Sequence, residues 1–199
     1  SFGLQSQTVS IIDDEQIPTV TLSVGAPTID ETQSGTTVIS TTVIATLSNF
    51  SSQTITVNLE KSGLPKENAD YTLSNIITIA PGTRSGFTTL TSIADTLYEV
   101  RPNNTNETVI IKINSVENGT TTSLQQQEVA IIDDDVKPTV TLTVVPDLIN
   151  EVLPTNKSSV VATLNTFAGQ DVVVTLSKNS ASTAIDTLDY ILDAITITI

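Results

Sequence analysis

Internal repetition is the feature that most limits how this chain can fold. Residues 11–24, IIDDEQIPTVTLSV, match residues 131–144, IIDDDVKPTVTLTV, at 10 of 14 positions with an offset of 120. The segment VIATLSNFSSQTITVNLEK (43–61) likewise resembles VVATLNTFAGQDVVVTLSK (160–178). A repeat of about 120 residues has the size of a domain and is too long for a solenoid unit. The sequence therefore predicts domains in tandem.

The frame of the repeats predicts the domain boundaries. Residues 1–16 correspond to residues 121–136, so we expect them to be the last strand of a preceding repeat. Residues 17–136 are expected to form one complete domain, and residues 137–199 the first half of a following, truncated repeat. On this interpretation the chain is cut from a longer array.

Within the repeat, apolar residues alternate with threonine and serine, as at Val20, Leu22 and Val24. This period of two, in runs rich in valine, isoleucine and threonine, is typical of strands with one buried face. Turn sequences such as Pro81-Gly82 and Asn118-Gly119 separate the runs. We predict an all-β fold of tandem antiparallel, seven-stranded, immunoglobulin-like β-sandwiches. The expected strands of the complete repeat lie near 18–24, 37–47, 54–60, 75–80, 85–94, 107–116 and 122–132.

The composition excludes several kinds of chemistry. There is no Cys and no His, which rules out disulfides, thiolate or histidine metal sites, and Ser-His-Asp catalysis. With 22 acidic and 8 basic residues, a net charge of −14, the chain is expected to repel nucleic acid and anionic membranes. Its expected small partner is a hard cation, Ca²⁺ or Mg²⁺. No apolar run approaches the roughly 18 residues of a membrane span, so we expect no membrane insertion.

Acidic residues gather in the loops of the complete repeat. Loops of an antiparallel sandwich alternate between its two ends. The loops after the first, third and fifth expected strands should therefore lie at the same end as the segment that leaves the seventh. We expect eight carboxylates to meet there: Glu31, Asp70, Asp95, Glu99, Glu107, Asp133, Asp134 and Asp135.

Two interpretations of this cluster are open. Eight carboxylates are enough to hold two or more Ca²⁺ ions, each of which takes 6–8 oxygen ligands. Alternatively they are ordinary solvated loop acids, because aspartate is common in turns. The run of three acids at residues 133–135, matched by Asp13, Asp14 and Glu15 in the preceding copy, favours metal binding.

The motifs of the complete repeat resemble those of Calx-beta domains, the β-sandwich modules of sodium–calcium exchangers and of many bacterial surface proteins. The resemblance covers residues 17–136 and half of another copy. It rests on DYT at 70–72, SIADTLYE at 92–99 followed by Glu107, and AIIDDD at 130–135. It implies a Ca²⁺ cluster formed by the same eight acids. The family often has an acidic pair or triple where this chain has Ala94-Asp95-Thr96. The segment VRPNNTN (100–106), which contains Arg101, also interrupts the acidic run after Tyr98. Both departures imply fewer ions or weaker binding.

The partial copies contain only parts of this site. Asp13, Asp14 and Glu15 stand alone, and Glu151 and Asp189 match Glu31 and Asp70 without their other partners, so we expect neither half-site to hold Ca²⁺ tightly. The truncated repeat also lacks about three strands, which predicts an exposed edge. Either that part is unstable, or another chain completes it by strand complementation.

Three functions are consistent with the sequence. The first is a structural module of a large extracellular repeat protein, an adhesin or a cell-surface or matrix protein. There Ca²⁺ would order the apical loops and the junction between neighbouring repeats, and the surface ligand is unknown. The alternatives are a Ca²⁺-sensing regulatory domain of a transporter and a non-catalytic accessory domain of a secreted enzyme. The first function predicts an extracellular or cell-surface location. We expect the chain itself to have no catalytic activity.

Overall fold

The computed structural model describes residues 3, 5–12, 14–31, 39–99, 105–150 and 156–199. All regular secondary structure in these ranges is β. None of the described segments is a helix with the length and apolar character needed to cross a membrane.

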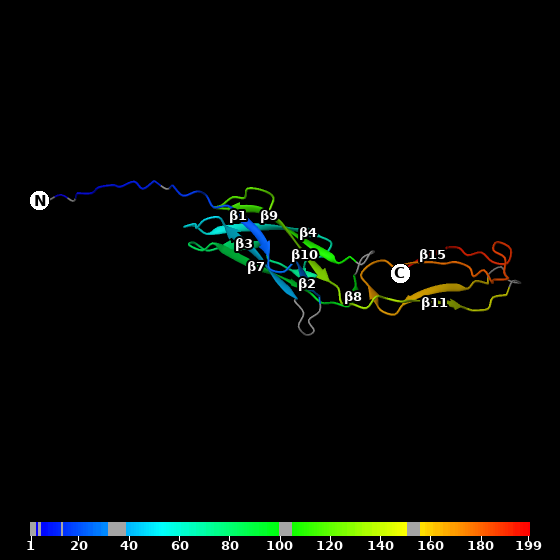
Figure 1. Cartoon of the computed structure of the whole chain (residues 1–199). Helices are drawn as coiled ribbons and strands as arrows, with labels where there is room; N and C mark the ends of the chain where they lie inside the picture. The colour runs from blue at the N-terminus through cyan, green and yellow to red at the C-terminus, as the bar shows by residue number, and fades with distance from the viewer. Residues whose placement is uncertain (1–2, 4, 13, 32–38, 100–104, 151–155) are drawn as a thin grey trace.

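Described strands between Val20 and Ile132 form two facing sheets (Figure 1). One sheet has the strand order β1 (Val20–Val24), β3 (Ser40–Leu47), β7 (Ser85–Ser92) and β5 (Tyr71–Thr72). The other has the order β2 (Thr28–Asp30), β10 (Gln126–Ile132), β9 (Glu107–Glu117), β4 (Ile55–Gly63) and β6 (Ile76–Ile79). Neighbouring strands are antiparallel except β2 and β10, which run parallel.

The core lies between the sheets and follows the alternation of the sequence. In β3 the side chains of Val43, Ala45 and Leu47 are buried, while the residues between them are half-buried. On the opposite sheet, Val109 and Ile111 of β9 are fully buried. Burying such a side chain stabilises the fold by about 1.5–3 kcal/mol. The predicted all-β sandwich is confirmed.

The expected strands correspond to β1, β3, β4, β6, β7, β9 and β10. Among the described residues of this repeat, three short strands were not predicted: β2, β5 and β8 (Leu97–Tyr98). With two or three residues each, they are too short to show an alternating pattern, and only their partner strands define them.

The C-terminal part of the chain contains the hairpin β11 (Val140–Val145) with β12 (Ser159–Leu164) and the pair β14 (Val173–Thr175) with β15 (Thr196–Thr198). The pairing of β11 with β12 has the register of β1 with β3, because Leu142 lies opposite Ala162 as Leu22 lies opposite Ala45. Burial differs, since Leu22 is 4% exposed and Leu142 is 49% exposed. A short parallel pairing of β13 (Phe167–Ala168) with β8 joins this part to the sandwich.

At the other end of the molecule, the described residues before Pro18 form no strand and extend away from the sandwich (Figure 1). Val9 and Ile11 are 84% and 91% exposed, whereas Val129 and Ile131, at the matching positions of β10, are 0% and 5% exposed.

Candidate metal centre

The parallel pairing of β2 with β10 brings two acidic segments to one end of the sandwich. Ile29 lies beside Ile131, so the two strands end together. The N–H of Glu31, the residue after β2, donates to the carbonyl of Ile132 at 3.0 Å, and Asp133 follows Ile132 directly. The alternation of loops between the two ends of the sandwich predicted that Glu31 and Asp133 lie at the same end, and the parallel pairing of β2 with β10 is what places them there.

Glu31, Asp133 and Asp135 form the first group, which we call the Glu31 triad. One carboxylate oxygen from each lies within 4.8 Å of the others. Glu31 is 2% exposed, whereas both aspartates are half-buried. The N–H of Asp135 donates to Oδ1 of Asp133 at 2.7 Å, a local bond that folds the segment after β10 back on itself.

Asp70, Glu99 and Glu107 form the second group, the Asp70 triad, with the same spacing of oxygens within 4.8 Å. They come from three segments far apart in the sequence: the loop before β5, the residue after β8, and the start of β9. Asp70 and Glu107 are buried, and Glu99 is half-buried. Oδ2 of Asp70 accepts a hydrogen bond from the N–H of Lys66.

The charge around Glu31 shows how tightly the acids are grouped. Burial, followed by the negative charges of Asp95, Asp133, Glu99 and Asp135 in that order, raises the pKa of Glu31 from 4.5 to about 8. A carboxylate in such surroundings is stabilised by a cation or by a proton. The N–H of Glu99, in the Asp70 triad, donates a hydrogen bond to the carboxylate of Asp133, in the Glu31 triad, so the two triads lie side by side.

Glu99 has the matching environment. Burial, followed by the charges of Asp70, Glu107, Asp95 and Asp133, raises the pKa of Glu99 from 4.5 to about 7. The first two of these acids belong to its own triad, and Asp133 belongs to the other. The charges of both triads therefore act on Glu99.

The donor set fits a hard divalent cation. Both triads offer only carboxylate oxygens, which are the ligands that Ca²⁺ and Mg²⁺ prefer. Two oxygens on opposite sides of a Ca²⁺ ion, each about 2.3–2.6 Å from it, are about 4.6–5.2 Å apart. The oxygens within each triad lie no more than 4.8 Å apart, which is close enough for one ion to contact all three. Three carboxylates carry six oxygens, about the lower limit of Ca²⁺ coordination.

Two of the eight predicted ligands belong to neither triad. Asp95 is exposed, and its Oδ1 accepts a hydrogen bond from the N–H of Leu97 at 2.6 Å, yet its charge acts on Glu31, Glu99 and Asp135. Asp134 is exposed, and its charge contributes to the raised pKa of Asp135, for which burial is the largest cause. That any of the eight binds metal stays a prediction.

Three residues named in the sequence interpretation lie outside the described residues, namely Asp13, Arg101 and Glu151. Asp189 is described and exposed, and Oδ2 of its carboxylate accepts a hydrogen bond from the N–H of Ile185 at 2.6 Å.

Sequence reasoning missed two residues that contact the Glu99 segment. The N–H of Gly169 donates to the carbonyl of Tyr98, and the side-chain amide of Gln170 donates to the carbonyl of Glu99, both at 3.0 Å. A Cβ at Gly169 would lie 2.7 Å from Cγ of Glu99, so any larger residue here would have to displace the Glu99 side chain. These contacts join parts of the chain 71 residues apart and have no local sequence signal.

Comparisons with known proteins complete the description. No protein-family model and no curated protein matches the chain. Among solved structures, it is similar to the apo-form Calx CBD1 domain, with 18% identity, a TM-score of 0.47, and coverage of 60% of this chain and 100% of that one. It is also similar to CBD12 from CALX1.2 (18% identity, TM-score 0.44, 58% and 45% covered). The calcium binding domain CBD12 of CALX1.1 is a third similar structure (13% identity, TM-score 0.43, 74% and 75% covered). At these identities and TM-scores, the likenesses carry no conclusion about what this chain binds.

Proposed function

We propose that residues 17–136 are a Ca²⁺-binding β-sandwich domain of a large extracellular repeat protein, an adhesin or another cell-surface or matrix protein. One observation carries the proposal: two triads of carboxylates lie at a single end of the domain, and their negative charges repel one another. Three of the six acids are buried. Divalent cations offset that repulsion, and the all-oxygen donor set favours Ca²⁺ or Mg²⁺.

Ca²⁺ at this end orders the apical loops and the junction with the following repeat. The segment that contains Asp133 and Asp135 leads within a few residues into β11. Glu99 follows β8, which pairs with β13 of the next part of the chain. Both connections support a role for the ion in limiting motion between neighbouring repeats.

The proposed repeat boundaries are 1–16, 17–136 and 137–199. They are supported by the shared register of β11–β12 and β1–β3. Neighbouring repeats of the same protein are the first partner. The exposure of Leu142 and Val144, 49% and 48%, supports completion of residues 137–199 by additional strands, including strand complementation by another chain.

A thermal melt in Ca²⁺ and in chelator tests this function. Extracellular modules bind Ca²⁺ with dissociation constants of about 10⁻⁴–10⁻³ M. At a Ca²⁺ concentration about 100 times the dissociation constant, each occupied site should stabilise the fold by about 2.7 kcal/mol. NaCl of equal ionic strength is the control for screening, and Mg²⁺ tests selectivity. Equal melting temperatures in Ca²⁺ and chelator would exclude Ca²⁺ binding. A dissociation constant of about 10⁻⁶ M would favour the sensor alternative.

A further inference from the structure

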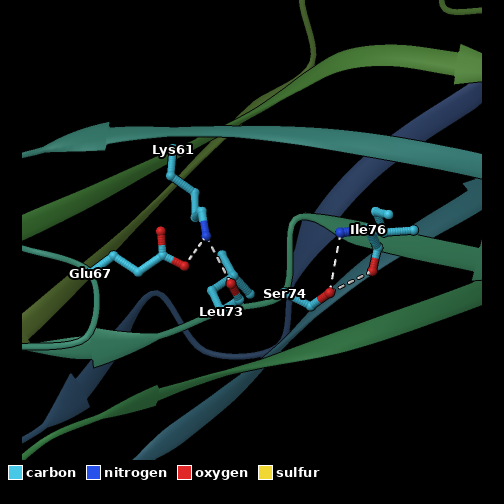
Figure 2. A network of polar contacts seen from close by, with 5 residues as sticks. All are labelled: Lys61, Glu67, Leu73, Ser74 and Ile76. Atoms are coloured by element: carbon cyan, nitrogen blue, oxygen red, sulfur yellow. Dashed lines mark hydrogen bonds and ion pairs between the residues drawn. The ribbon is translucent and has the colours of Figure 1, made fainter.

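Lys61 of β4 is a charged residue in an unusual position, because its side chain is only 8% exposed. Figure 2 shows its ammonium group between the carboxylate of Glu67, with which it forms an ion pair, and the carbonyl of Leu73, to which it donates a hydrogen bond at 2.8 Å. A buried ammonium needs such partners, since leaving it unpaired is costly.

The two partners of Lys61 flank Asp70 in the sequence. Residues 66–71, which we call the Asp70 loop, are closed by their own hydrogen bonds. Asn68 N–H donates to the carbonyl of Tyr71 at 2.8 Å, and Asp70 N–H donates to the carbonyl of Lys66 at 2.9 Å. On the far side of Leu73, the Ser74 hydroxyl bonds with both the N–H and the carbonyl of Ile76 (Figure 2). Lys61 thus ties both sides of a self-contained loop to the sheet.

The second copy of this loop separates what the loop does alone from what Lys61 adds. In residues 185–190 the same bonds recur: Ile185 N–H donates to Oδ2 of Asp189, and Thr187 N–H donates to the carbonyl of Tyr190. Thr187 has a φ of 69°, close to the 66° of Asn68. Yet Lys178, at the position of Lys61, is exposed, and Asp189 is exposed where Asp70 is buried. The loop conformation is therefore local, whereas the buried position of Asp70 accompanies the buried lysine.

We propose that Lys61 is a positioning residue for the cation site of the Asp70 triad, holding Asp70 opposite Glu99 and Glu107 before a cation binds. This inference rests on the proposed Ca²⁺ site. Three carboxylates with oxygens within 4.8 Å repel one another, which favours movement of the loop away from the other two acids. The anchor opposes that movement. A ligand held in place beforehand loses less conformational freedom on binding, which increases affinity.

The test is a Ca²⁺ titration of the full chain by calorimetry. Asp70→Asn first identifies the binding step that belongs to the Asp70 triad. Lys61→Met should weaken that step by about tenfold or more, as is usual for residues that orient ligands, and leave the step of the Glu31 triad within about twofold. Lys61→Arg should restore part of the affinity. The matched control is Lys66→Met, which removes the same charge from an exposed side chain of the same loop.

The outcomes separate the two proposals. No heat of binding in the wild-type chain would overturn both the Ca²⁺ site and the role of Lys61. A wild-type chain that binds Ca²⁺, with Lys61→Met equal to Lys66→Met, would overturn only the positioning role. If Lys61→Met does not fold, Glu67→Gln keeps the lysine in place while weakening its ion pair. That variant should lower the affinity of the same step several-fold, and an unchanged isotherm would overturn the positioning role.

Discussion

The backbone N–H of Glu99 donates a hydrogen bond to the carboxylate of Asp133, which lies 34 residues further along the chain. Through this bond an acid of the Glu31 triad holds the backbone of an acid of the Asp70 triad. The other oxygen of Asp133 accepts from the N–H of Asp135. Asp133 is therefore the residue whose change should affect both triads.

Asp133→Asn should lower the affinity of both Ca²⁺ steps by at least about tenfold. The change removes the charge of one ligand, and it replaces one of the two carboxylate oxygens that accept hydrogen bonds from backbone N–H groups. Asp134→Asn is the matched control, since it removes an equal charge from the exposed neighbour that belongs to neither triad. Calorimetric titration of both variants checks the prediction. Equal affinities for the two variants would contradict a central place for Asp133.

Without metal, stability should fall as the pH rises from about 5 to about 8. The pKa values of Glu31 and Glu99 are raised from 4.5 to about 8 and about 7, mainly by burial, so in this range the folded chain holds more protons than the unfolded chain. We expect the melting temperature in chelator to drop by several degrees over this interval.

Saturating Ca²⁺ should remove most of that drop, because the ion takes the place of the protons. Glu31→Gln should also flatten the profile in chelator, since it removes the group with the larger rise in pKa. Thermal melts at a series of pH values measure all three profiles. A melting temperature in chelator that increases with pH would refute the electrostatic account.

Gly169→Val should open the contact between β13 and β8. A Cβ at this position overlaps Glu99, and the N–H of Gly169 loses its acceptor, Tyr98, if the backbone moves away. We expect the backbone amide at position 169 to lose at least about tenfold of its protection against hydrogen exchange while the sandwich stays folded. Gly3→Val is the control, because a Cβ there meets no atom within 4 Å. Hydrogen exchange read by NMR checks the result, and an unchanged rate would show that this contact is absent in solution.

Two isoleucines in matching sequence should respond very differently to truncation. Ile131→Ala removes a side chain that is 5% exposed and should lower the free energy of unfolding by about 2–5 kcal/mol. Ile11→Ala changes a side chain that is 91% exposed and should leave the free energy of unfolding within about 0.5 kcal/mol of the wild-type value. Urea unfolding of both variants measures the difference. A similar loss in both would mean that Ile11 is buried in solution.

Much of the sandwich could be predicted because its long strands have one buried face, which imposes a period of two on residues such as Val43, Ala45 and Leu47. The grouping of acids at one end was predictable from the alternation of loops. Their division into two triads could not be predicted. Asp95, Asp133 and Asp134 are all loop aspartates, and only the positions of their side chains separate Asp133 from the other two. The roles of Lys61 and Gly169 were also hidden, since each depends on close contact with a residue that no local pattern identifies.

The segment IID occurs at 11–13 and again at 131–133, and it shows that identical local sequence does not decide the structure in this protein. The amino acids alone determine the alternation of apolar and polar residues and the shape of the Asp70 loop, which forms in the same way around Asp189. Whether an isoleucine–isoleucine pair becomes a strand depends on its neighbours: Ile131 lies between β9 and β2, whereas Ile11 has no strand beside it among the described residues. The physical reason is that backbone hydrogen bonds and buried area in a sheet come from other strands, so tertiary structure decides which copies form the core and which acids meet.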